Sequence, residues 1–331
     1  MERADRTAGE GGCVAGDSSP LSRTLRPSDT VEDAVRALSA GGLVILPTET
    51  VYGLAADAGN ANAVAAIFEA KGRPRFNPLI AHVSGAVEAE TVAVFDSVAR
   101  ALAGAFWPGP LTIVAPIRDT GRVCDLARAG LDSVAVRAPG HARARAVIAA
   151  FGGPVVAPSA NRSGRPSPTT VADAVEETGR AAAAAVDGGP CAVGVESTVV
   201  SVLDGRVALL RPGAVTRDEI VALIGPLSPG EQGHRSPGRL TTHYAPDAPV
   251  RINATDARPG EILFGFGPGP GDLRWSLSPA GDLREAAANL FRLLREADRT
   301  GPVGIAVVPV PAHGLGEAIN DRLRRAAGAV G

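Results

Sequence analysis

The sequence predicts an α/β protein with a mixed, twisted sheet in its first 224 residues and a smaller open α/β domain from residue 250 onward. Three observations predict this organisation. Strand and helix patterns are intermixed without strict alternation up to residue 224, which favours a mixed sheet. Residues 225–249 are rich in Pro, Gly, Ser and His, as expected of a linker. Beyond them, strand and helix patterns alternate over about 80 residues, which is typical of a small open α/β domain.

The elements of the first domain follow from caps, apolar runs and helix breakers. Thr30 and Asp33 have the spacing of a capping box, and the helix that they begin should end near Gly41-Gly42. Pro108 should end a later helix, and Asp204-Gly205 predicts a tight hairpin. The expected strands are Leu43–Leu46, Leu79–Val83, Leu111–Ile117, Ser133–Arg137, Pro154–Ala157, Thr198–Leu203 and Val207–Leu210. The expected helices after the first are Asn62–Ala70, Ser97–Phe106, Val171–Thr178 and Arg217–Ile224.

The second domain should contain three strands and two helices. The expected strands are Val250–Ile252, Glu261–Phe266 and Val303–Val310, and the expected helices are Leu283–Ala297 and Leu315–Ala327. The stretch Gly265–Gly271 alternates glycine with Phe or Pro. It lacks the G-x-G-x-x-G spacing of a dinucleotide site, and its prolines have no N–H to offer a phosphate, so it is interpreted as a loop.

The composition excludes several classes of protein. With 45% apolar and 21% charged residues the chain is typical of globular proteins. A net charge of −2 provides no overall basic field for nucleic acid, although a local basic patch would be compatible with it. Cys13, Cys124 and Cys191 lack metal-ligand spacing, which argues against structural zinc or a disulfide framework and fits a reducing compartment. Residues 1–25 are polar and lack a signal-peptide core, so we expect a disordered tail and a cytoplasmic protein.

The sequence contains a single lysine, and all its other Lys or Arg residues are arginine. Lys71 is the only lysine among the 33 basic residues. In an extended chain Lys71, Arg73 and Arg75 would point to the same side, where three cations repel one another unless an anion lies between them. A phosphate-rich ligand fits this pattern. A solvated basic loop, with one lysine retained by chance, is the alternative.

Two further polar clusters follow predicted strands, where α/β proteins usually bind ligands. Pro47–Leu54 contains two hydroxyls, a carboxylate and a phenol, and Pro158–Ser167 combines hydroxyl and amide side chains with glycine, which suits phosphate oxygens. A capped turn and an ordinary Ser/Asn turn are the alternatives. Arg137, Glu196-Ser197-Thr198 and Arg211 add polar groups at other strand ends. The chain has no Walker A loop, no Ser/His/Asp triad context and no metal-ligand set, so any metal would arrive with a nucleotide.

Seven motifs occur in an order that resembles the YrdC-like family. They are PTETVYGL, AKGRPRFNPL, FWPGPLT, VAVRAPGH, PSANRSGRPSPT, GVESTVV and LLRPG, which together span roughly residues 30–222. The segment Ser236–Pro246 is similar to the SPG…HYAP linker of the long, two-domain threonylcarbamoyl-AMP synthases, and GLGEAINDRL is similar to the end of their second domain. The resemblance therefore covers nearly all of the chain after residue 25.

The resemblance implies a YrdC-like catalytic domain at 26–224 with a large, positively charged concave cleft, a linker or lid at 225–249 and a small Rossmann-like domain at 250–331. It implies a nucleotidyltransferase that forms threonylcarbamoyl-AMP and pyrophosphate from L-threonine, bicarbonate or CO2 and ATP with magnesium. This product would serve the N6-threonylcarbamoyladenosine modification of tRNA adenosine 37. The residues implied to hold L-threonine are Thr48, His82, Arg137 and Ser197. Those implied to hold ATP are Lys71, Arg75, Ser133, Ser159, Asn161, Ser167, Arg211 and Tyr244, with Lys71 and Arg73 as the catalytic cations.

The implied chemistry needs no protein nucleophile, because positioning and charge stabilisation can accelerate both carbamate formation and adenylyl transfer. Tyr244 on the linker is expected to cover the nucleotide and shield the adenylate from water. A mobile tether, with Tyr244 packed on the second domain, is the alternative. Downstream tRNA threonylcarbamoyl transferase machinery and weak RNA binding are the expected partners, without a membrane. Two other functions remain open: a non-catalytic double-stranded RNA binder, and another carbamoyl-adenylate-forming enzyme such as those of hydrogenase maturation, whose CxxC pairs are missing here.

Overall fold

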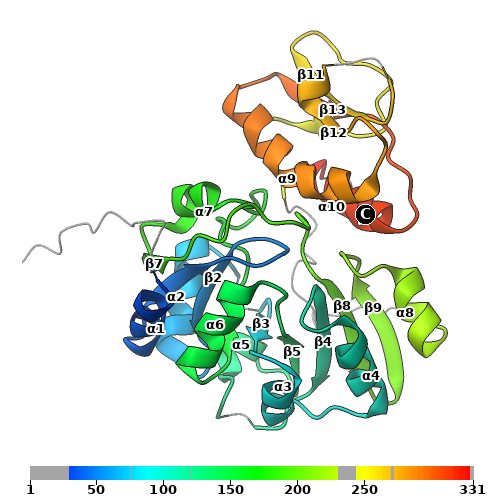
Figure 1. Cartoon of the computed structure of the whole chain (residues 1–331). Coiled ribbons are helices and arrows are strands. Elements are labelled where there is room, and N and C mark those ends of the chain that lie inside the picture. Colours follow the sequence, from blue (N-terminus) through cyan, green and yellow to red (C-terminus); the bar gives the residue numbers. More distant parts are fainter. Residues whose placement is uncertain (1–29, 75, 120, 230–243, 270–271, 329–331) are drawn as a thin grey trace, which may run out of the picture.

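The chain folds into two α/β units, each built on its own sheet (Figure 1). The computed structural model describes residues 30–328 except residues 75, 120, 230–243 and 270–271. A mixed nine-stranded sheet forms the first unit and a parallel four-stranded sheet the second. Both the mixed, twisted α/β class of the first part and the small α/β second part are as predicted. Within the described part of the chain, no helix has the length and apolarity needed to cross a bilayer.

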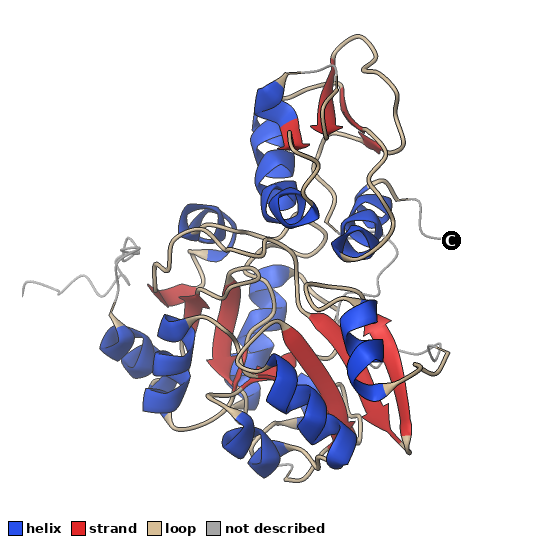
Figure 2. Cartoon of the chain, turned by 45° about the vertical axis from the view of Figure 1, so that its right-hand side comes forward, coloured by secondary structure: helices blue, strands red, loops and turns tan. Residues whose placement is uncertain are grey.

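The larger sheet has the strand order β7-β1-β2-β6-β3-β5-β4-β8-β9. Its strands are β1 (Leu43–Leu46), β2 (Gly53–Asp57), β3 (Ile80–His82), β4 (Leu111–Pro116), β5 (Ser133–Arg137), β6 (Val155–Val156), β7 (Ala182–Ala185), β8 (Thr198–Leu203) and β9 (Arg206–Arg211). Its helices are α1 (Val31–Ser39), α2 (Ala61–Lys71), α3 (Ala86–Val92), α4 (Ser97–Phe106), α5 (Asp125–Arg128), α6 (Ala142–Phe151), α7 (Val171–Thr178) and α8 (Arg217–Ile224). Figure 2 shows these helices packed around the strands.

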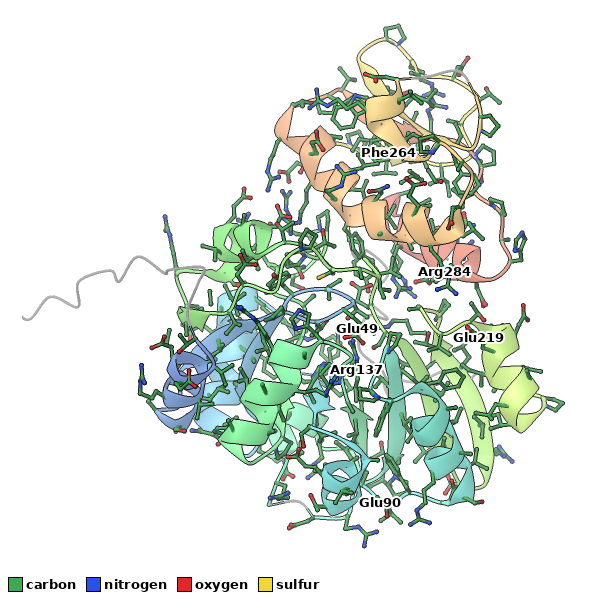
Figure 3. The ribbon with its side chains drawn as sticks, viewed as in Figure 1. Glu49, Glu90, Arg137, Glu219, Phe264 and Arg284 are labelled. Carbon is green, nitrogen blue, oxygen red and sulfur yellow. The ribbon has the colours of Figure 1, made fainter. Side chains whose placement is uncertain are left out.

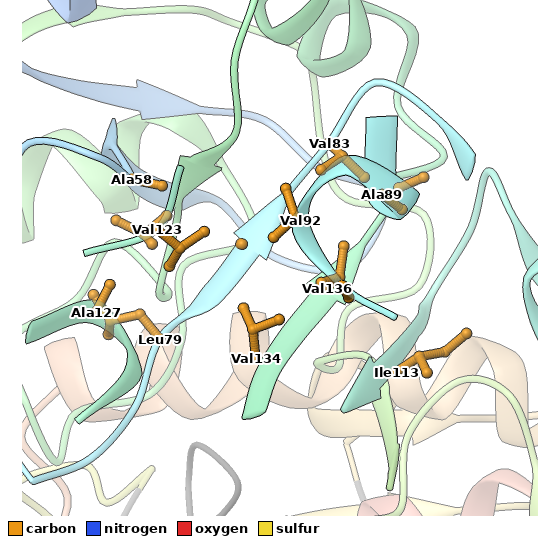
Figure 4. Packing of buried hydrophobic residues seen from close by; sticks show 14 of the residues in the cluster. Ala58, Leu79, Val83, Ala89, Val92, Ile113, Val123, Ala127, Val134 and Val136 are labelled. Carbon is orange, nitrogen blue, oxygen red and sulfur yellow. The ribbon is translucent and has the colours of Figure 1, made fainter. Parts of the chain in front are cut away.

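The core of the first unit lies on both sides of its sheet. Strand β1 is buried along its whole length, and its alternate residues face different clusters: Leu43 and Ile45 pack with α2, whereas Val44 and Leu46 pack with α1 and α6. The α2-side cluster continues to β3, β5 and α3, where Figure 4 shows Val83, Val92, Val136 and their neighbours in contact. Ile80, Val114, Ala135 and Val199 form a separate small cluster, and Ile80 also faces the cavity described below.

Many of the predicted bounds are confirmed. Seven elements have the predicted limits: β1, β5, β8, β11 (Glu261–Phe266), α4, α7 and α8. The capping box of Thr30 and Asp33 is present, and Asp204 and Gly205 both have the positive φ of a tight hairpin turn. Strands β2 and β7 and helices α3, α5 and α6 were not predicted. Strand β7 consists of four alanines, which favour a helix in isolation and are held in the sheet by parallel pairing with β1.

The second unit contains β10 (Val250–Arg251), β11 (Glu261–Phe266), β12 (Ser276–Ser278), β13 (Gly304–Val307), α9 (Leu283–Arg299) and α10 (Leu315–Ala326). Its four strands are all parallel, in the order β10-β13-β11-β12. Figure 1 shows α9 and α10 between this sheet and the first unit. Helix–helix contact between the units is made by α9 and α7, where Arg299 pairs with Asp173 and Glu176. The two helices therefore provide the surface by which the second unit docks.

Three expectations fall on residues outside the described part of the chain. They are the tail at residues 1–25, the side chain of Arg75 and residues 230–243 of the linker 225–249. Tyr244 is described.

Candidate active site

A cavity opens where the larger sheet faces the second unit. The space between its lining residues is about 500 Å³, part of which is continuous with open solvent. The residues that line it are Thr50, Val51, Arg73, Leu79, Ile80, His82, Arg137, Ala157, Pro158, Ser159, Glu196, Ser197, Arg211 and Tyr244. Seven of these were predicted as site residues from the sequence: Arg73, His82, Arg137, Ser159, Ser197, Arg211 and Tyr244. Strand ends and the loops that follow them provide most of the polar groups, as is usual in α/β proteins.

The first group of polar residues surrounds Arg137 at the end of β5. Its Nη2 lies 2.7 Å from Oε1 of Glu49, its Nη1 donates to Thr50 Oγ1 at 2.9 Å, and its Nε donates to the Gly109 carbonyl at 3.2 Å. Figure 3 shows Glu49 and Arg137 side by side beneath the second unit. Burial opposes ionisation of Glu49, but Arg137 and the Gly140 backbone outweigh it and hold the pKa of Glu49 below its ordinary value. Arg137 is thus fixed in place by an internal carboxylate.

His82 is the neighbour of Arg137 across the sheet, because β3 and β5 pair these two residues directly. Its Nδ1 lies 3.1 Å from the Ile80 carbonyl, and since a carbonyl can only accept, Nδ1 must carry the hydrogen. Burial first, and the charge of Arg137 second, lower the pKa of His82 to about 3. The ring is therefore neutral at physiological pH, and its Nε2 is a hydrogen-bond acceptor beside a guanidinium.

Thr48 lies beneath this group rather than in the cavity wall. Its hydroxyl donates to the Val51 carbonyl at 2.6 Å and accepts from the N–H groups of Thr50 and Val51. This is a capped turn, the alternative given above for the cluster Pro47–Leu54. Its Oγ1 is also 2.8 Å from that of Thr50, which receives a hydrogen bond from Arg137. In this structure Thr48 therefore orients a residue of the cavity.

The second group of polar residues centres on Arg211 and Arg73. Arg211 donates from Nε and Nη2 to the Ser197 carbonyl at 3.1 and 2.9 Å, and from Nη2 to Ser197 Oγ at 3.1 Å. Arg73 donates from Nη2 to the Pro78 carbonyl at 3.2 Å. Burial lowers the pKa of Arg73 to about 10, and that of Arg211 falls for the same reason. No carboxylate of the described residues lies within ion-pair distance of either guanidinium, so this end of the cavity is suited to an anion.

Lys71 supports this end from outside the cavity lining. It is the last residue of α2, and its buried ammonium donates to the carbonyls of Ser159 and Asn161. The expectation that Lys71, Arg73 and Arg75 share one side of an extended chain was wrong for Lys71, because this residue is helical and Gly72 has a left-handed conformation with φ of 58°. Burial, reinforced by Arg73, lowers the pKa of Lys71 well below its ordinary value.

The remaining predicted residues lie at different distances from the cavity. Ser167 donates to Glu196 Oε1. The side-chain amide of Asn161 donates to the carbonyls of Arg162 and Arg165 and so closes the turn within the cluster Pro158–Ser167. Ser133 is buried at the opposite end of β5 from Arg137, and its hydroxyl has no hydrogen-bond partner among the described residues. Ser133 is not part of the cavity wall.

Tyr244 closes one side of the cavity. It is buried, has a left-handed backbone with φ of 67°, and its ring centroid lies 5.3 Å from that of Phe291 on α9. The next residue, Ala245, donates its N–H to the Gly164 carbonyl at 2.7 Å. Tyr244 thus lines the cavity and also packs on the second unit.

Sequence reasoning missed three residues of this site: Glu49, Thr50 and Glu196. All three belong to polar clusters that the sequence analysis did single out, but a lone carboxylate or hydroxyl carries no spacing signal of its own. No cluster of three or more His, Cys, Asp or Glu side chains that could hold a metal ion occurs in the described ranges. What the cavity can do chemically is hold an amino-acid-like group at Arg137 and His82 and a polyanion at Arg73 and Arg211.

Comparisons with known proteins point to one family. Residues 36–213 match the family model for the Sua5/YciO/YrdC group, described as telomere recombination, and residues 215–328 match that of the threonylcarbamoyl-AMP synthase C-terminal domain. The chain is 38% identical to the threonylcarbamoyl-AMP synthase of Bacillus subtilis, covering 90% of this chain and 93% of the relative. It is 40% identical to the enzyme of that name from Pyrococcus abyssi, covering 87% and 91%.

A solved structure agrees with these sequence relatives. The crystal structure of P. abyssi Sua5 complexed with L-threonine is 38% identical and superposes with a TM-score of 0.82, covering 90% of this chain and 94% of that one. The likeness extends over both units, because the matched part of the chain is larger than either one alone.

Proposed function

The chain belongs to the Sua5/YrdC family of threonylcarbamoyl-AMP synthases, and from this premise we propose how its residues carry out the reaction. The activity is that of a nucleotidyltransferase which makes threonylcarbamoyl-AMP with ATP as a substrate. We propose that L-threonine and bicarbonate, or CO2 derived from it, are the other substrates and that pyrophosphate is released. The observation that carries the assignment of residues is the chemical difference between the two ends of the cavity.

The Arg137 end is proposed to hold L-threonine. A guanidinium has five N–H groups: hydrogen bonds to Thr50 and Gly109 use two of them, and the ion-pair contact with Glu49 faces a third, on Nη2. Two N–H groups therefore remain for a planar carboxylate. The neutral ring of His82 offers Nε2 to the amino group, because an acceptor is needed there. Thr48 and Ser197 complete the proposed threonine set.

The Arg73 and Arg211 end is proposed to hold the phosphates of ATP. Two buried guanidiniums without carboxylate partners among the described residues support this, since a triphosphate would supply the missing charge. Lys71 would act by holding the loop that carries Ser159 and Asn161. Ser167, which donates to Glu196, is also assigned to ATP. Arg75, Ser133 and Tyr244 complete the proposed ATP set. The described residues offer no protein ligand cluster for magnesium, so we propose that this ion is held by phosphate oxygens and water.

The proposed reaction has two steps. The threonine ammonium group first loses a proton to give the free amine. The amine nitrogen then forms a bond to the carbon of CO2 as one C=O π bond breaks, and a second proton leaves the nitrogen for solvent, which gives the carbamate. A carbamate oxygen then forms a bond to the α-phosphorus of ATP as the bond from that phosphorus to the pyrophosphate oxygen breaks. Arg73 and Arg211 stabilise the charge on the phosphates, and Arg137 fixes the carboxylate so that the reacting atoms approach.

Tyr244 is proposed to protect the product from water. Its position in the cavity wall supports this role, because an aromatic ring there removes solvent from the site. The lid expected at residues 225–249 would extend the same cover, and residues 230–243 lie outside the described chain. Because the adenylate is short-lived, another enzyme must use it soon after it is formed. We propose that the threonylcarbamoyl group is passed to tRNA threonylcarbamoyl transferase machinery in the cytoplasm.

The exchange of pyrophosphate into ATP tests the proposed function. Radiolabelled pyrophosphate should enter ATP only when L-threonine and bicarbonate are both present, because the reverse reaction needs the carbamoyl adenylate. Exchange that proceeds without threonine would point to another carbamoyl-adenylate chemistry and would contradict the proposal.

A further inference from the structure

Arg322, in the second unit, is fully buried although it is an arginine. It lies on α10, has 0% of its surface exposed, and reaches across to the first unit. Its Nε donates to Glu196 Oε2 at 2.9 Å, and its Nη1 donates to the Pro212 carbonyl at 2.8 Å. Removing a guanidinium from water is costly, and such contacts stabilise it only when its partners are held in good geometry. Arg322 therefore depends on the position of two backbone segments of the first unit.

Those two segments carry the anion-binding end of the cavity. Glu196 immediately precedes Ser197, and Pro212 immediately follows Arg211. Ser197 and Arg211 are joined by three hydrogen bonds that lie between 2.9 and 3.1 Å. Arg322 thus connects the start of β8 to the end of β9 from the side of the second unit.

Glu196 extends the connection to a third segment. Its other oxygen, Oε1, accepts a hydrogen bond from Ser167 Oγ at 2.5 Å. Burial opposes ionisation of Glu196, but Arg322 and then Arg211 outweigh it, so the pKa of Glu196 stays below its ordinary value. The carboxylate is therefore charged, and it joins the serine loop to α10.

Besides Glu196, Pro212 and its helix neighbour Asp321, whose Oδ2 accepts from Nη1 at 2.9 Å, Arg322 also contacts Tyr244. The guanidinium carbon of Arg322 lies 5.5 Å from the centroid of the Tyr244 ring, within the range of a cation–π contact. Phe291 of α9 packs against the same ring. The ring that closes the cavity is therefore held by two side chains of the second unit.

We infer that Arg322 is a positioning residue through which the second unit shapes the nucleotide-binding end of the cavity. The inference rests on the proposed assignment of Arg211 and Ser167 to ATP. It gives the second unit a role mainly in binding ATP, because Arg322 contacts Pro212, next to Arg211, and Glu196, which accepts a hydrogen bond from Ser167. Of the proposed threonine set, only Ser197 is next to a contact of Arg322, and none of these contacts is next to Arg137 or His82.

Other contacts between the units provide matched controls. Arg217 of α8 pairs with Glu317 of α10 at 2.6 Å, and Arg299 of α9 pairs with Asp173 and Glu176 of α7. Both arginines are about half exposed and neither lines the cavity. Their removal weakens docking without touching the nucleotide end, and exposed pairs of this kind contribute little to stability.

The test uses the full-length chain and calorimetric titration with MgATP and with L-threonine separately. Arg322→Lys keeps the charge but cannot contact Glu196 and Pro212 together, so it should weaken ATP binding about tenfold. Threonine affinity should fall clearly less than ATP affinity, because Ser197 is the one member of the proposed threonine set that adjoins a contact of Arg322. Arg322→Met should have a larger effect on ATP. In a chain that already carries Glu196→Gln, the further change Arg322→Met should alter ATP affinity much less than it does in the wild-type chain, because the two residues act as a pair.

The control variants are Arg217→Gln and Arg299→Gln, which should bind both ligands as wild type does. Thermal unfolding identifies the folded variants, and Arg322→Lys alone decides the matter where Arg322→Met does not fold. ATP affinity unchanged in Arg322→Lys, an equal loss for threonine, or an equal ATP loss in Arg299→Gln would each overturn the inference. A wild-type chain that binds threonine but no ATP would instead contradict the proposed function.

Discussion

Arg137 on β5 forms an ion pair with Glu49, in the loop after β1, with 2.7 Å between Nη2 and Oε1. Both side chains are largely buried, so each depends on the other for compensation of its charge. Because β3 places the neutral His82 beside this pair, the proposed threonine end of the cavity combines a fixed guanidinium with an uncharged ring. Changes at the Arg137 end of the cavity and at the Arg73 and Arg211 end should affect the binding of L-threonine and of ATP separately, and each affinity can be measured.

Arg137→Ala should weaken binding of L-threonine by about 100-fold, whereas ATP affinity should change by less than about threefold. The reason is that only the threonine carboxylate is proposed to pair with the guanidinium of Arg137 through two hydrogen bonds. Separate calorimetric titrations measure both. Arg100→Ala is the control, since it removes an exposed ion pair with Glu90 and should bind both ligands normally. Equal losses for the two ligands would mean that Arg137 supports the sheet or the nucleotide instead.

His82 should make the protein less stable as the pH falls below 6.5. The unfolded chain gains a proton near pH 6.5, whereas the folded ring, with a pKa of about 3, does not. Because the unfolded state binds more protons, the free energy of unfolding should rise with pH, by up to about 1.4 kcal/mol per unit between about pH 5 and 6.5. Urea unfolding of wild type and His82→Gln across this window checks it. The same slope in both proteins would show that His82 titrates alike in the folded and unfolded states.

Lys71→Arg should reduce product formation by about 100-fold, and Lys71→Ala should abolish it. The ammonium fits a fully buried site between the carbonyls of Ser159 and Asn161, where a planar guanidinium is too large. Steady-state assays, with circular dichroism to confirm folding, provide the measurement. Near wild-type turnover in Lys71→Arg would mean that this lone lysine is incidental.

Gly213→Ala should disturb the nucleotide end through the backbone. A Cβ at Gly213 would lie 2.3 Å from the Thr198 nitrogen and 2.5 Å from the Glu196 carbonyl oxygen. We expect a loss of about 1–3 kcal/mol in the free energy of unfolding, together with weaker ATP binding. Gly104→Ala on α4 is the control: no atom lies within 4 Å of its Cβ, and it should stabilise the protein by about 0.5–1 kcal/mol. Equal unfolding energies and ATP affinities for the two variants would refute the steric account.

Much of the fold was predictable from local signals. The Thr30–Asp33 capping box and the Asp204-Gly205 turn act within a few residues, and both are present. Strand β7 was not predictable, because four alanines become a strand only through pairing with β1. Local chemistry similarly identified the clusters around the cavity.

The partners within those clusters could not be read from the sequence. Lys71 contacts backbone carbonyls, which any residue could supply. Glu49 pairs with Arg137, 88 residues further along the chain, and Glu196 pairs with Arg322, 126 residues further along. Only the folded chain brings these partners together. Non-local ion pairs of this kind carry no spacing pattern, which is why both carboxylates were missed.

The most direct test of the account is formation of the carbamoyl adenylate itself. The full-length chain is incubated with L-threonine, ATP, magnesium and radiolabelled bicarbonate, and the nucleotide products are separated and identified by mass. The account predicts that label appears in threonylcarbamoyl-AMP with an equal amount of pyrophosphate, and that omission of any one substrate abolishes it. ATP cleavage that leaves no label in an adenylate, or an unchanged yield without threonine, would contradict the account.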